Sequence, residues 1–365
     1  MLRRLAYFVS SHGFGHAARA AAVLDRLLER APELEAHVFA GTPEWFFKQS
    51  FDGRLPESLV FHAWETDVGL VQATALEENL DATIEQLSAW YPLRAERLEP
   101  AVEAVRALGV DAVAADISPL GLAVAEDLGL PSILIENFTW TWIYRGYGRA
   151  ELEPFAACLA PLFDGATRRL RTAPFCGPLD HDPRHTAVGP VARRPRSAPA
   201  DVRRALDIPP NEPMVLVTMG GVPWDFRGLQ SHLEARGLRD CHLVVAGGAD
   251  TYTRVGKARL IPHRSDFYHP DLARAADAVV AKLGYSTVAE VACSGGRLGY
   301  VPRPRFPESP ELEAWVGEHL ACRRFEPEQL EDGSWLDGLG ELLDRPPHAP
   351  VGGGAEAAAE LILSL

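Results

Sequence analysis

The chain has 365 residues, of which 47% are hydrophobic and 24% charged, and its formal net charge is −14 at pH 7. This length exceeds what one hydrophobic core usually supports, so we expect two domains. The acidic balance argues against a nucleic-acid-binding protein and leaves at most peripheral contact with a membrane, because both of those partners are negatively charged.

Cysteine usage and hydropathy predict a cytoplasmic protein. The five cysteines are scattered and lack Cys-x-x-Cys spacing, which predicts neither a disulfide framework nor a zinc site. No apolar stretch is long enough to span a bilayer. Residues 1–4 run directly into a strand-like segment, without the pattern of a signal peptide.

The first half of the chain alternates between strand-like and helical patterns. Apolar runs typical of buried strands lie at residues 5–9, 37–40, 59–62, 112–115 and 132–135. Helical patterns lie at residues 17–30, at 76–108 with an interruption at Pro92, and at 119–128. This rhythm predicts βαβ units in a parallel, doubly wound sheet.

The second half repeats this architecture after a segment of different character. Residues 188–200 are rich in proline and arginine and have no period, which is typical of a linker. Beyond it, strand-like runs lie at 214–218, 242–246, 278–281 and 298–301, and helical ones at 199–206, 270–276, 287–294 and 355–365.

These patterns predict an α/β protein of two Rossmann-like domains. We place them at residues 1–190 and 199–350, joined by a linker at 191–198. The helix within residues 351–365 is expected to pack back on the first domain. The carboxyl ends of both sheets would line a cleft between the domains, where open α/β sheets bind ligands.

The loop after the first strand has more candidate functional residues than any other segment of the first domain. Its glycines, Gly13 and Gly15, let the backbone approach a ligand closely. His12 and His16 add acid–base chemistry, and Arg19 is suited to hold a phosphate or carboxylate or to face solvent.

Two loops of the second domain could hold phosphate. Gly220 and Gly221 follow a strand, where they form either a phosphate loop or a tight turn. Residues 282–290 read Lys-Leu-Gly-Tyr-Ser-Thr-Val-Ala-Glu, which places a lysine, a glycine turn and two hydroxyls at a helix start. Glu290 could close a Thr-x-x-Glu capping box or accept from ribose hydroxyls. Neither loop matches Gly-x-Gly-x-x-Gly or the Walker A motif, which disfavours a dehydrogenase or a P-loop NTPase.

Aromatic residues gather in residues 138–147. The alternate spacing of Phe138, Trp140, Trp142 and Tyr144 would place all four on one face of an extended segment. That face would serve either in the core or as a platform on which a sugar stacks.

Taken together and in this order, several segments resemble the GT-B class of glycosyltransferases. The resemblance is closer to the glycosyltransferase-like N-terminal region of L-arabinokinases than to the N-acetylglucosaminyltransferase that makes lipid II in peptidoglycan synthesis. It is carried by residues 12–19, 67–73, 115–119, 136–144, 220–221, 282–290 and 303–310.

The resemblance implies that the second domain binds a nucleotide sugar. The diphosphate would lie against the backbone and side chains of Gly220, Gly221, Lys282, Gly284, Tyr285, Ser286 and Thr287. Glu290 would hold the ribose, and the loop with His263 and Arg264 would flank the base. Glu308 and Glu311 would accept hydroxyls of the donor sugar, although the glutamines of the peptidoglycan enzyme are missing from this stretch.

For the first domain, the resemblance implies the acceptor side and the base. His16 would take the proton of an acceptor hydroxyl, with Asp116 orienting its ring. His12, Gly13, Gly15, Arg19 and Trp140 would lie on the acceptor side. No Asp-x-Asp motif is present, so we expect Lys282 and helix N-termini, rather than a metal, to stabilise the leaving diphosphate, and no cofactor beyond the nucleotide sugar as co-substrate.

Three functions remain open from the sequence. The first is an inverting glycosyltransferase of the hexosyl or N-acetylhexosaminyl type, using a nucleoside-diphosphate sugar with UDP as the expected nucleotide. The second is a nucleotide-sugar-binding or regulatory protein that keeps the scaffold without catalysis. The third is a nucleotide-sugar 2-epimerase, which the lack of a recognisable acidic cluster near the cleft disfavours. The donor sugar, the acceptor and the oligomeric state are not specified by the sequence.

Overall fold

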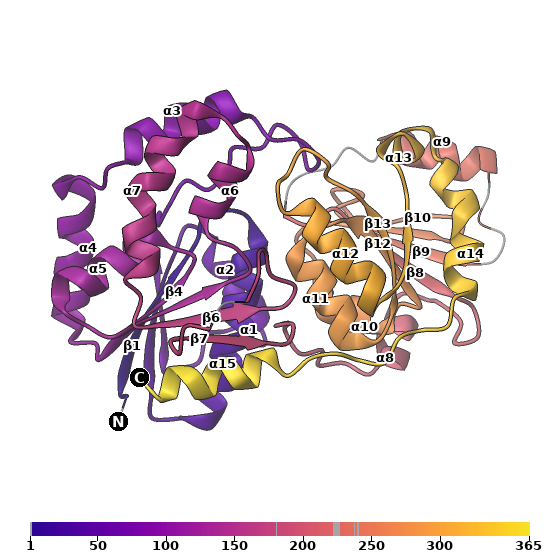
Figure 1. Cartoon of the computed structure of the whole chain (residues 1–365). Helices are drawn as coiled ribbons and strands as arrows, with labels where there is room; N and C mark the ends of the chain where they lie inside the picture. Colours follow the sequence, from indigo (N-terminus) through magenta and orange to yellow (C-terminus); the bar gives the residue numbers. More distant parts are fainter. Residues whose placement is uncertain (1, 180, 222–226, 237, 239–240) are drawn as a thin grey trace.

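The computed structural model describes residues 2–179, 181–221, 227–236, 238 and 241–365. Within these residues the chain forms two domains, each built on a seven-stranded sheet with helices on both faces (Figure 1). The predicted fold class, two Rossmann-like α/β domains, is therefore confirmed.

In the first sheet every strand is parallel to its neighbours, in the order β3-β2-β1-β4-β5-β6-β7. The strands are β1 (Arg4–Val9), β2 (Glu35–Ala40), β3 (Leu59–Ala63), β4 (Ala112–Asp116), β5 (Ser132–Glu136), β6 (Arg168–Thr172) and β7 (His185–Val188). The helices are α1 (Phe14–Arg30), α2 (Glu44–Ser50), α3 (Leu80–Trp90), α4 (Ala95–Leu108), α5 (Pro119–Leu128), α6 (Trp140–Gly146) and α7 (Glu153–Asp164). The strand order reverses between β1 and β4, and ligands of such sheets bind beyond the carboxyl ends of the strands at this reversal.

The second sheet has the order β10-β11-β9-β8-β12-β13-β14, with only β10 antiparallel to its neighbour among the described strands. The strands are β8 (Met214–Thr218), β9 (His242–Ala246), β10 (Thr253–Val255), β11 (Ala258–Ile261), β12 (Ala278–Lys282), β13 (Arg297–Val301) and β14 (Ala321–Arg324). The helices of this domain are α8 (Pro199–Ala205), α9 (Arg227–Arg236), α10 (His269–Ala275), α11 (Tyr285–Ser294), α12 (Ser309–His319), α13 (Pro327–Asp332) and α14 (Leu339–Asp344), and the last helix of the chain is α15 (Gly354–Leu363). Here the order reverses between β8 and β12, whose following loops are the two predicted phosphate loops.

Most predicted elements are confirmed within a few residues, with two informative differences. The long helical pattern at 76–108 is two helices, α3 and α4, separated around Pro92. The extended segment predicted for the aromatic residues is wrong. α6 begins at Trp140, where the Thr139 hydroxyl accepts from the Trp142 N–H as an N-cap, so the alternate spacing does not place these rings on one face.

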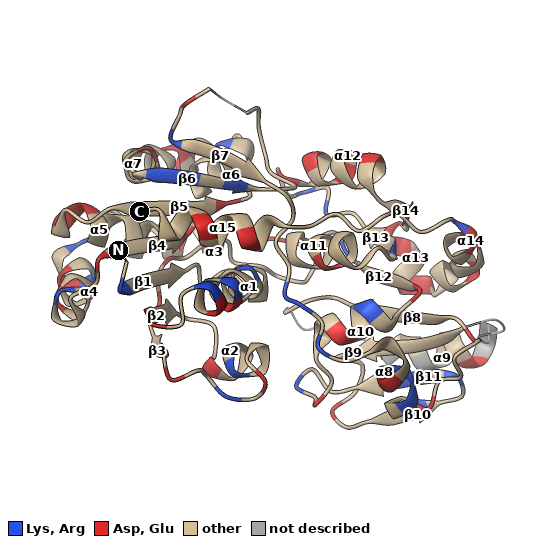
Figure 2. Cartoon of the chain, turned by 90° about the horizontal axis from the view of Figure 1, so that it is seen from below, with Lys and Arg blue, Asp and Glu red and all other residues tan. Residues whose placement is uncertain are grey.

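The domains are joined twice. Residues 189–198 connect β7 to α8 without regular structure, and Figure 2 shows basic positions along this connection. Beyond α14 the chain returns, so that α15, yellow in Figure 1, lies against the first domain near both termini. Ala358 and Ile362 of α15 are fully buried in the same core cluster as α1.

No helix in the described ranges combines the length and the apolar character needed to cross a membrane.

Candidate functional site

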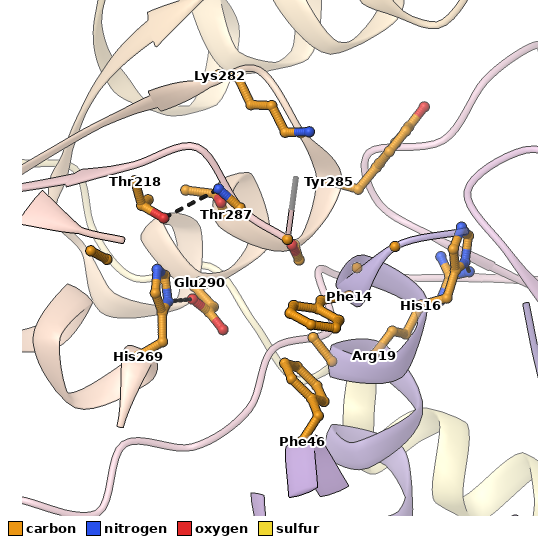
Figure 3. Close-up of a pocket in the computed structure, with 18 of the residues that line it drawn as sticks. Phe14, His16, Arg19, Phe46, Thr218, His269, Lys282, Tyr285, Thr287 and Glu290 are labelled. Atoms are coloured by element: carbon orange, nitrogen blue, oxygen red, sulfur yellow. Dashed lines mark hydrogen bonds and ion pairs between the residues drawn. The ribbon is translucent and has the colours of Figure 1, made fainter. Parts of the chain in front are cut away.

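A pocket lies between the two domains, at the strand-order reversals of both sheets. It is lined from one side by the loop after β1 and the start of α1, and from the other by the loops after β8, β11, β12 and β13. In Figure 3, His16 and Arg19 lie on α1 to one side of the pocket, while Lys282 and Tyr285 approach from the second domain. A Cβ atom added at Gly15 would lie 3.7 Å from the Ser286 hydroxyl oxygen, so the two glycine loops face each other closely.

His16 and Asp116 form a buried pair in the first domain. His16 lies in the first turn of α1 and Asp116 at the end of β4, and the two strands concerned are neighbours. His16 Nδ1 donates to Asp116 Oδ1 at 2.8 Å. This hydrogen bond places the proton of the neutral ring on Nδ1 and leaves Nε2 with a free lone pair, which suits a general base.

Arg19 makes a second, bidentate contact with the same carboxylate. Its Nε and Nη2 donate to the two oxygens of Asp116 at 2.7 and 2.6 Å, and Nη1 donates to the Asn137 side chain. Burial alone would raise the pKa of Asp116, but Arg19 and His16 together lower it, so the carboxylate is ionised. Of the two alternatives for Arg19, solvent exposure is excluded because the residue is only 6% exposed, and the carboxylate that it holds is that of Asp116. Arg19 donates its N–H groups to Asp116 and Asn137, and these groups are therefore not available to an external anion.

The backbone beside Asp116 is strained. Ile117 is fully buried and has φ +43°, in the left-handed region that β-branched residues rarely adopt. Such a conformation costs on the order of 1–3 kcal/mol and persists where surrounding structure requires it. The strain lies next to the carboxylate that orients His16, at the reversal of the first sheet.

His12 is held differently from His16. Its Nδ1 accepts from the Leu70 N–H at 3.3 Å, so the neutral ring carries its proton on Nε2, 3.0 Å from the Gln72 side-chain amide. The Gln72 atom at this distance is its amide nitrogen, which cannot accept, so a hydrogen bond here requires the amide to be turned over so that its oxygen accepts from that proton. Burial, followed by the charges of His16 and Arg303, lowers the pKa of His12 well below its usual range. His12 lines the pocket, but both of its ring nitrogens are engaged.

Trp140 supports this loop and does not present a stacking face. It is 1% exposed, and its indole N–H donates to Asp67 Oδ2 at 2.8 Å. Asp67 in turn accepts from the Ser11 N–H at 2.9 Å. Trp140 is absent from the pocket lining, whereas Phe138 is part of it. Of the two alternatives for the aromatic residues, the structure assigns Trp140 to the core.

The second domain presents an uncapped helix end to the pocket. α11 begins at Tyr285 after Gly284, and no side chain among the described residues caps it, so the N–H groups of its first turn are open to an anion. Gly220, Gly221, Ser286 and Thr287 also line the pocket. Of the two alternatives for Glu290, the capping box with Thr287 is excluded because both residues lie inside the helix, beyond its cap position.

Lys282 and Arg303 add positive charge beside this helix end. Burial, and next the charge of Arg303, lowers the pKa of Lys282 to about 7. Arg303 is buried with Nη1 3.7 Å from Glu308 Oε1, while its Nε and Nη2 and the other Glu308 oxygen find no partner among the described residues. These unpaired buried groups can hydrogen-bond a polar ligand. Glu311 does not share this position: it is exposed and outside the pocket lining.

The outer end of the pocket is aromatic. The ring of Phe14 is stacked with that of His263 at a centroid distance of 5.7 Å and with that of Phe46 at 4.8 Å. His263 lines the pocket, as expected for a residue flanking a base. Arg264 does not line it, because its exposed side chain lies 5.6 Å over Trp45.

Glu290 lies on the wall of the pocket with both oxygens engaged. Arg193 Nη2 donates to Oε1 at 3.0 Å, and His269 Nδ1 lies 2.7 Å from Oε2, the contact dashed in Figure 3. Burial would raise the pKa of Glu290, but His269 and Arg193 hold it at about 2. Neither Arg193 nor His269 is among the site residues predicted from the sequence. The unusual arginine content of the linker was the available signal for the former.

In the described part of the chain, no three His, Cys, Asp or Glu side chains gather as a potential metal site.

Two Rossmann-like domains with facing glycine loops and a cleft between them define the GT-B fold. No family model matches the chain. It is similar to L-arabinokinase of Arabidopsis thaliana, with 29% identity over 364 residues that cover 98% of this chain and 34% of that protein. The chain thus spans about a third of the length of this relative. An uncharacterized glycosyltransferase, MK0977 of Methanopyrus kandleri, is 25% identical over 278 residues, covering 71% of this chain and 76% of that protein.

Solved structures share the whole architecture. Arabidopsis thaliana UGT89C1 complexed with UDP superposes with a TM-score of 0.63 at 15% identity, covering 99% of both chains. The glycosyltransferase VinC in complex with DTDP gives 0.61 at 18%, covering 99% of this chain and 94% of the other. MurG of Acinetobacter baumannii gives 0.56 at 16%, covering 100% of both. These likenesses establish the GT-B fold, and the resemblance noted from the sequence is confirmed by the same relatives.

Proposed function

We propose that this protein is an inverting glycosyltransferase that moves a sugar from a nucleoside-diphosphate sugar, with UDP as the nucleotide, to an acceptor hydroxyl without a metal ion. One observation carries the proposal. His16, whose ring is joined at 2.8 Å to the buried Asp116 behind it, lines the same pocket wall as Gly15, and Gly15 lies against Ser286 at the uncapped start of α11. A base and a diphosphate-binding site therefore face each other across one cleft.

The second domain supplies the donor site in this proposal. The open N–H groups of α11, the Gly220–Gly221 turn and Lys282 bind the diphosphate. Glu290 accepts the ribose hydroxyls, and the loop with His263 flanks the base. Glu308, next to Arg303, accepts hydroxyls of the donor sugar. In solved proteins of the same fold, the bound nucleotides are UDP in one and DTDP in another, which supports a nucleotide at this place.

The chemistry is a single displacement. His16 Nε2 takes the proton of the acceptor hydroxyl as its oxygen forms a bond to the anomeric carbon. The bond from that carbon to the diphosphate oxygen breaks on the opposite face, and its electron pair leaves with the diphosphate. The configuration at carbon is inverted. The helix end and Lys282 stabilise the departing charge, and Asp116 stabilises the imidazolium.

The test begins with the donor. A thermal-shift screen of nucleotide sugars identifies the donor, since a ligand at a hundredfold excess over its Kd stabilises by ~2.7 kcal/mol. Release of free nucleotide is then measured with that donor and a panel of acceptors. His16→Ala is expected to keep the thermal shift and to reduce acceptor-dependent release by at least about a hundredfold, the usual contribution of a general base. Retained release in a folded His16→Ala protein would refute the assignment of the base.

A non-catalytic, nucleotide-sugar-binding role is the second candidate. It is favoured by the sequence relative that carries the name of a kinase and of which this chain covers 34%. The same experiment separates the two functions. A donor-specific thermal shift without any acceptor-dependent release, in the wild-type protein, would support the binding role.

A further inference from the structure

Arg193 connects the two domains through a single guanidinium. It lies in the segment between β7 and α8, which belongs to neither sheet. Nη2 donates to Glu290 of α11 at 3.0 Å, while Nη1 donates to the hydroxyl of Ser50, the last residue of α2, at 3.3 Å. One side chain thus bonds to a helix of each domain.

Aromatic rings fix the plane of this guanidinium. Its central carbon lies 4.8 Å from the ring centre of Phe46 in the first domain and 5.2 Å from that of Tyr268 in the second. Arg193 is 8% exposed and lines the pocket. Its Nε is buried without a partner among the described residues, so this N–H is available to a bound molecule. A fork-shaped donor held between rings loses little freedom when it bonds.

The contacts to Glu290 determine what this carboxylate can still accept. A carboxylate offers about two acceptor positions on each oxygen. Arg193 takes one on Oε1 and His269 takes one on Oε2. One position remains on each oxygen, which matches a pair of neighbouring hydroxyls such as the 2′- and 3′-hydroxyls of ribose. The charge of Arg193 also offsets that of Glu290, which reduces its repulsion of a diphosphate nearby.

We propose that Arg193 is a positioning residue that orients Glu290 to accept both ribose hydroxyls, and that it thereby makes the site select ribonucleoside diphosphates over 2′-deoxyribonucleoside diphosphates. This inference rests on the proposed function, which places the ribose at Glu290. A nucleotide without the 2′-hydroxyl leaves the second acceptor position on one oxygen of a buried carboxylate unfilled, and sites built around a substrate hydroxyl reject analogues that lack it. Because Ser50 and Phe46 help to hold Arg193, the selectivity depends on the arrangement of the domains.

The experiment compares UDP with 2′-deoxy-UDP, which share the base and the diphosphate. Their Kd values are measured by calorimetry on the wild-type protein, Arg193→Gln and Arg194→Gln. Arg194 is the matched control: it lies in the same segment, is exposed and pairs with Asp25 at 2.8 Å, so its substitution removes one charge without touching Glu290.

We expect the wild-type protein and Arg194→Gln to bind UDP at least about tenfold more tightly than the deoxy analogue, a difference of ~1.4 kcal/mol. In Arg193→Gln the ratio is expected to fall close to one, mainly through weaker UDP binding. A merely structural role would lower the melting temperature and leave the ratio unchanged, and that outcome overturns the proposal. A wild-type ratio of one overturns it as well, while failure of the wild-type protein to bind either nucleotide would instead refute the proposed function.

Ser50→Ala provides a second variant if Arg193→Gln does not fold. It removes the hydroxyl that accepts from Arg193 Nη1 and that donates to the Phe46 carbonyl within α2, and it leaves the bond between Arg193 and Glu290 in place. The ratio of the two Kd values is expected to fall at least about twofold, ~0.4 kcal/mol. An unchanged ratio in Ser50→Ala contradicts the link between selectivity and domain arrangement.

Discussion

At the scale of single residues, the cleft depends on groups whose charges are matched in pairs. Asp116 is shared between His16 and Arg19, and Glu290 between Arg193 and His269. Buried pairs of this kind contribute little net stability, but removing one partner leaves the other charge buried and uncompensated. Lys282 differs, because none of the ion pairs found among the described residues involves it.

The Asp116–Arg19 pair predicts a large loss of stability from a small substitution. Asp116→Asn keeps the shape of the side chain but leaves the guanidinium of Arg19 buried without its counter-charge. We expect a loss of about 3–5 kcal/mol in the free energy of unfolding, measured with urea. Asp201→Asn is the control, since it breaks an exposed pair with Arg204 that contributes about 1 kcal/mol or less. Similar losses in both variants would show that Arg19 does not need the carboxylate.

Lys282 predicts that nucleotide affinity depends on pH. With its pKa at about 7, the free protein loses this positive charge as the pH rises above 7. A bound diphosphate favours the charged form and raises the pKa, so binding takes up a proton in this range. We expect the Kd for UDP to increase from pH 7 to 9, by at most about tenfold per pH unit.

Calorimetry in buffers of different ionisation enthalpy would count that proton directly. Lys282→Arg keeps the charge throughout this range, so its Kd should change little between pH 7 and 9. Equal pH dependence in the wild-type and Lys282→Arg proteins would assign the proton to another group.

At the scale of secondary structure, the pattern of apolar residues predicts helices and strands well where apolar residues dominate the buried positions. The strand at residues 214–218 is entirely buried, and its unbroken apolar run predicts it with the same bounds. β6 was missed because three of its five residues are arginines, which do not resemble a buried strand. Two of them are neutralised by Glu136 of the adjacent strand, at 2.7 and 3.5 Å. Such a partner is visible only once the strand order is known.

The uncapped start of α11 predicts that a substitution that caps this helix raises the stability of the protein and weakens nucleotide binding. Gly284 has an extended backbone with φ −147°, and an added Cβ would meet nothing closer than 4.0 Å, so a larger residue fits there. Gly284→Asp would cap the helix and complement its dipole, which stabilises by up to about 1 kcal/mol. The same carboxylate occupies the open N–H groups and repels a diphosphate, so UDP affinity is expected to fall at least about tenfold.

A cap outside the cleft provides the control for this variant. Arg94 is the exposed N-cap residue of α4 and makes no side-chain capping bond there. Arg94→Asp should raise the melting temperature to a similar degree and leave UDP affinity unchanged. If Gly284→Asp also left it unchanged, the diphosphate would not lie at this helix end.

At the scale of the whole molecule, the C-terminal helix α15 returns to pack on the first domain. α15 comes from the far end of the sequence, and two of its acidic residues form ion pairs with α1, Glu360 with Arg30 at 2.8 Å and Glu356 with Arg26 at 3.8 Å. Gly354 lies so close to the backbone of Gly189 that no side chain fits there. The first domain is therefore completed by residues that follow the second one.

This closure predicts that a change in α15 destabilises the first domain. Ile362 is fully buried against the core that contains α1. Ile362→Ala is expected to cost about 2–5 kcal/mol and to accelerate hydrogen exchange in α1 more than in α11. Leu361→Ala, at a half-buried neighbour, should cost less. A loss confined to the second domain would contradict the assignment of α15 to the first core.

The sequence by itself determined the order of strands, glycine loops and helices, and hence the two Rossmann-like domains, because apolar period and glycine position act over a few neighbouring residues. The resemblance also implied the pairing of His16 with Asp116, which forms because β1 and β4 are neighbours. Tertiary structure alone decided the other partners, and Arg193 meets Glu290 because the linker passes between the domains. For the same reason, Trp140 and Arg19 are buried and hold Asp67 and Asp116 in place. Which charge a buried group faces depends on strand order and burial, which no local pattern encodes.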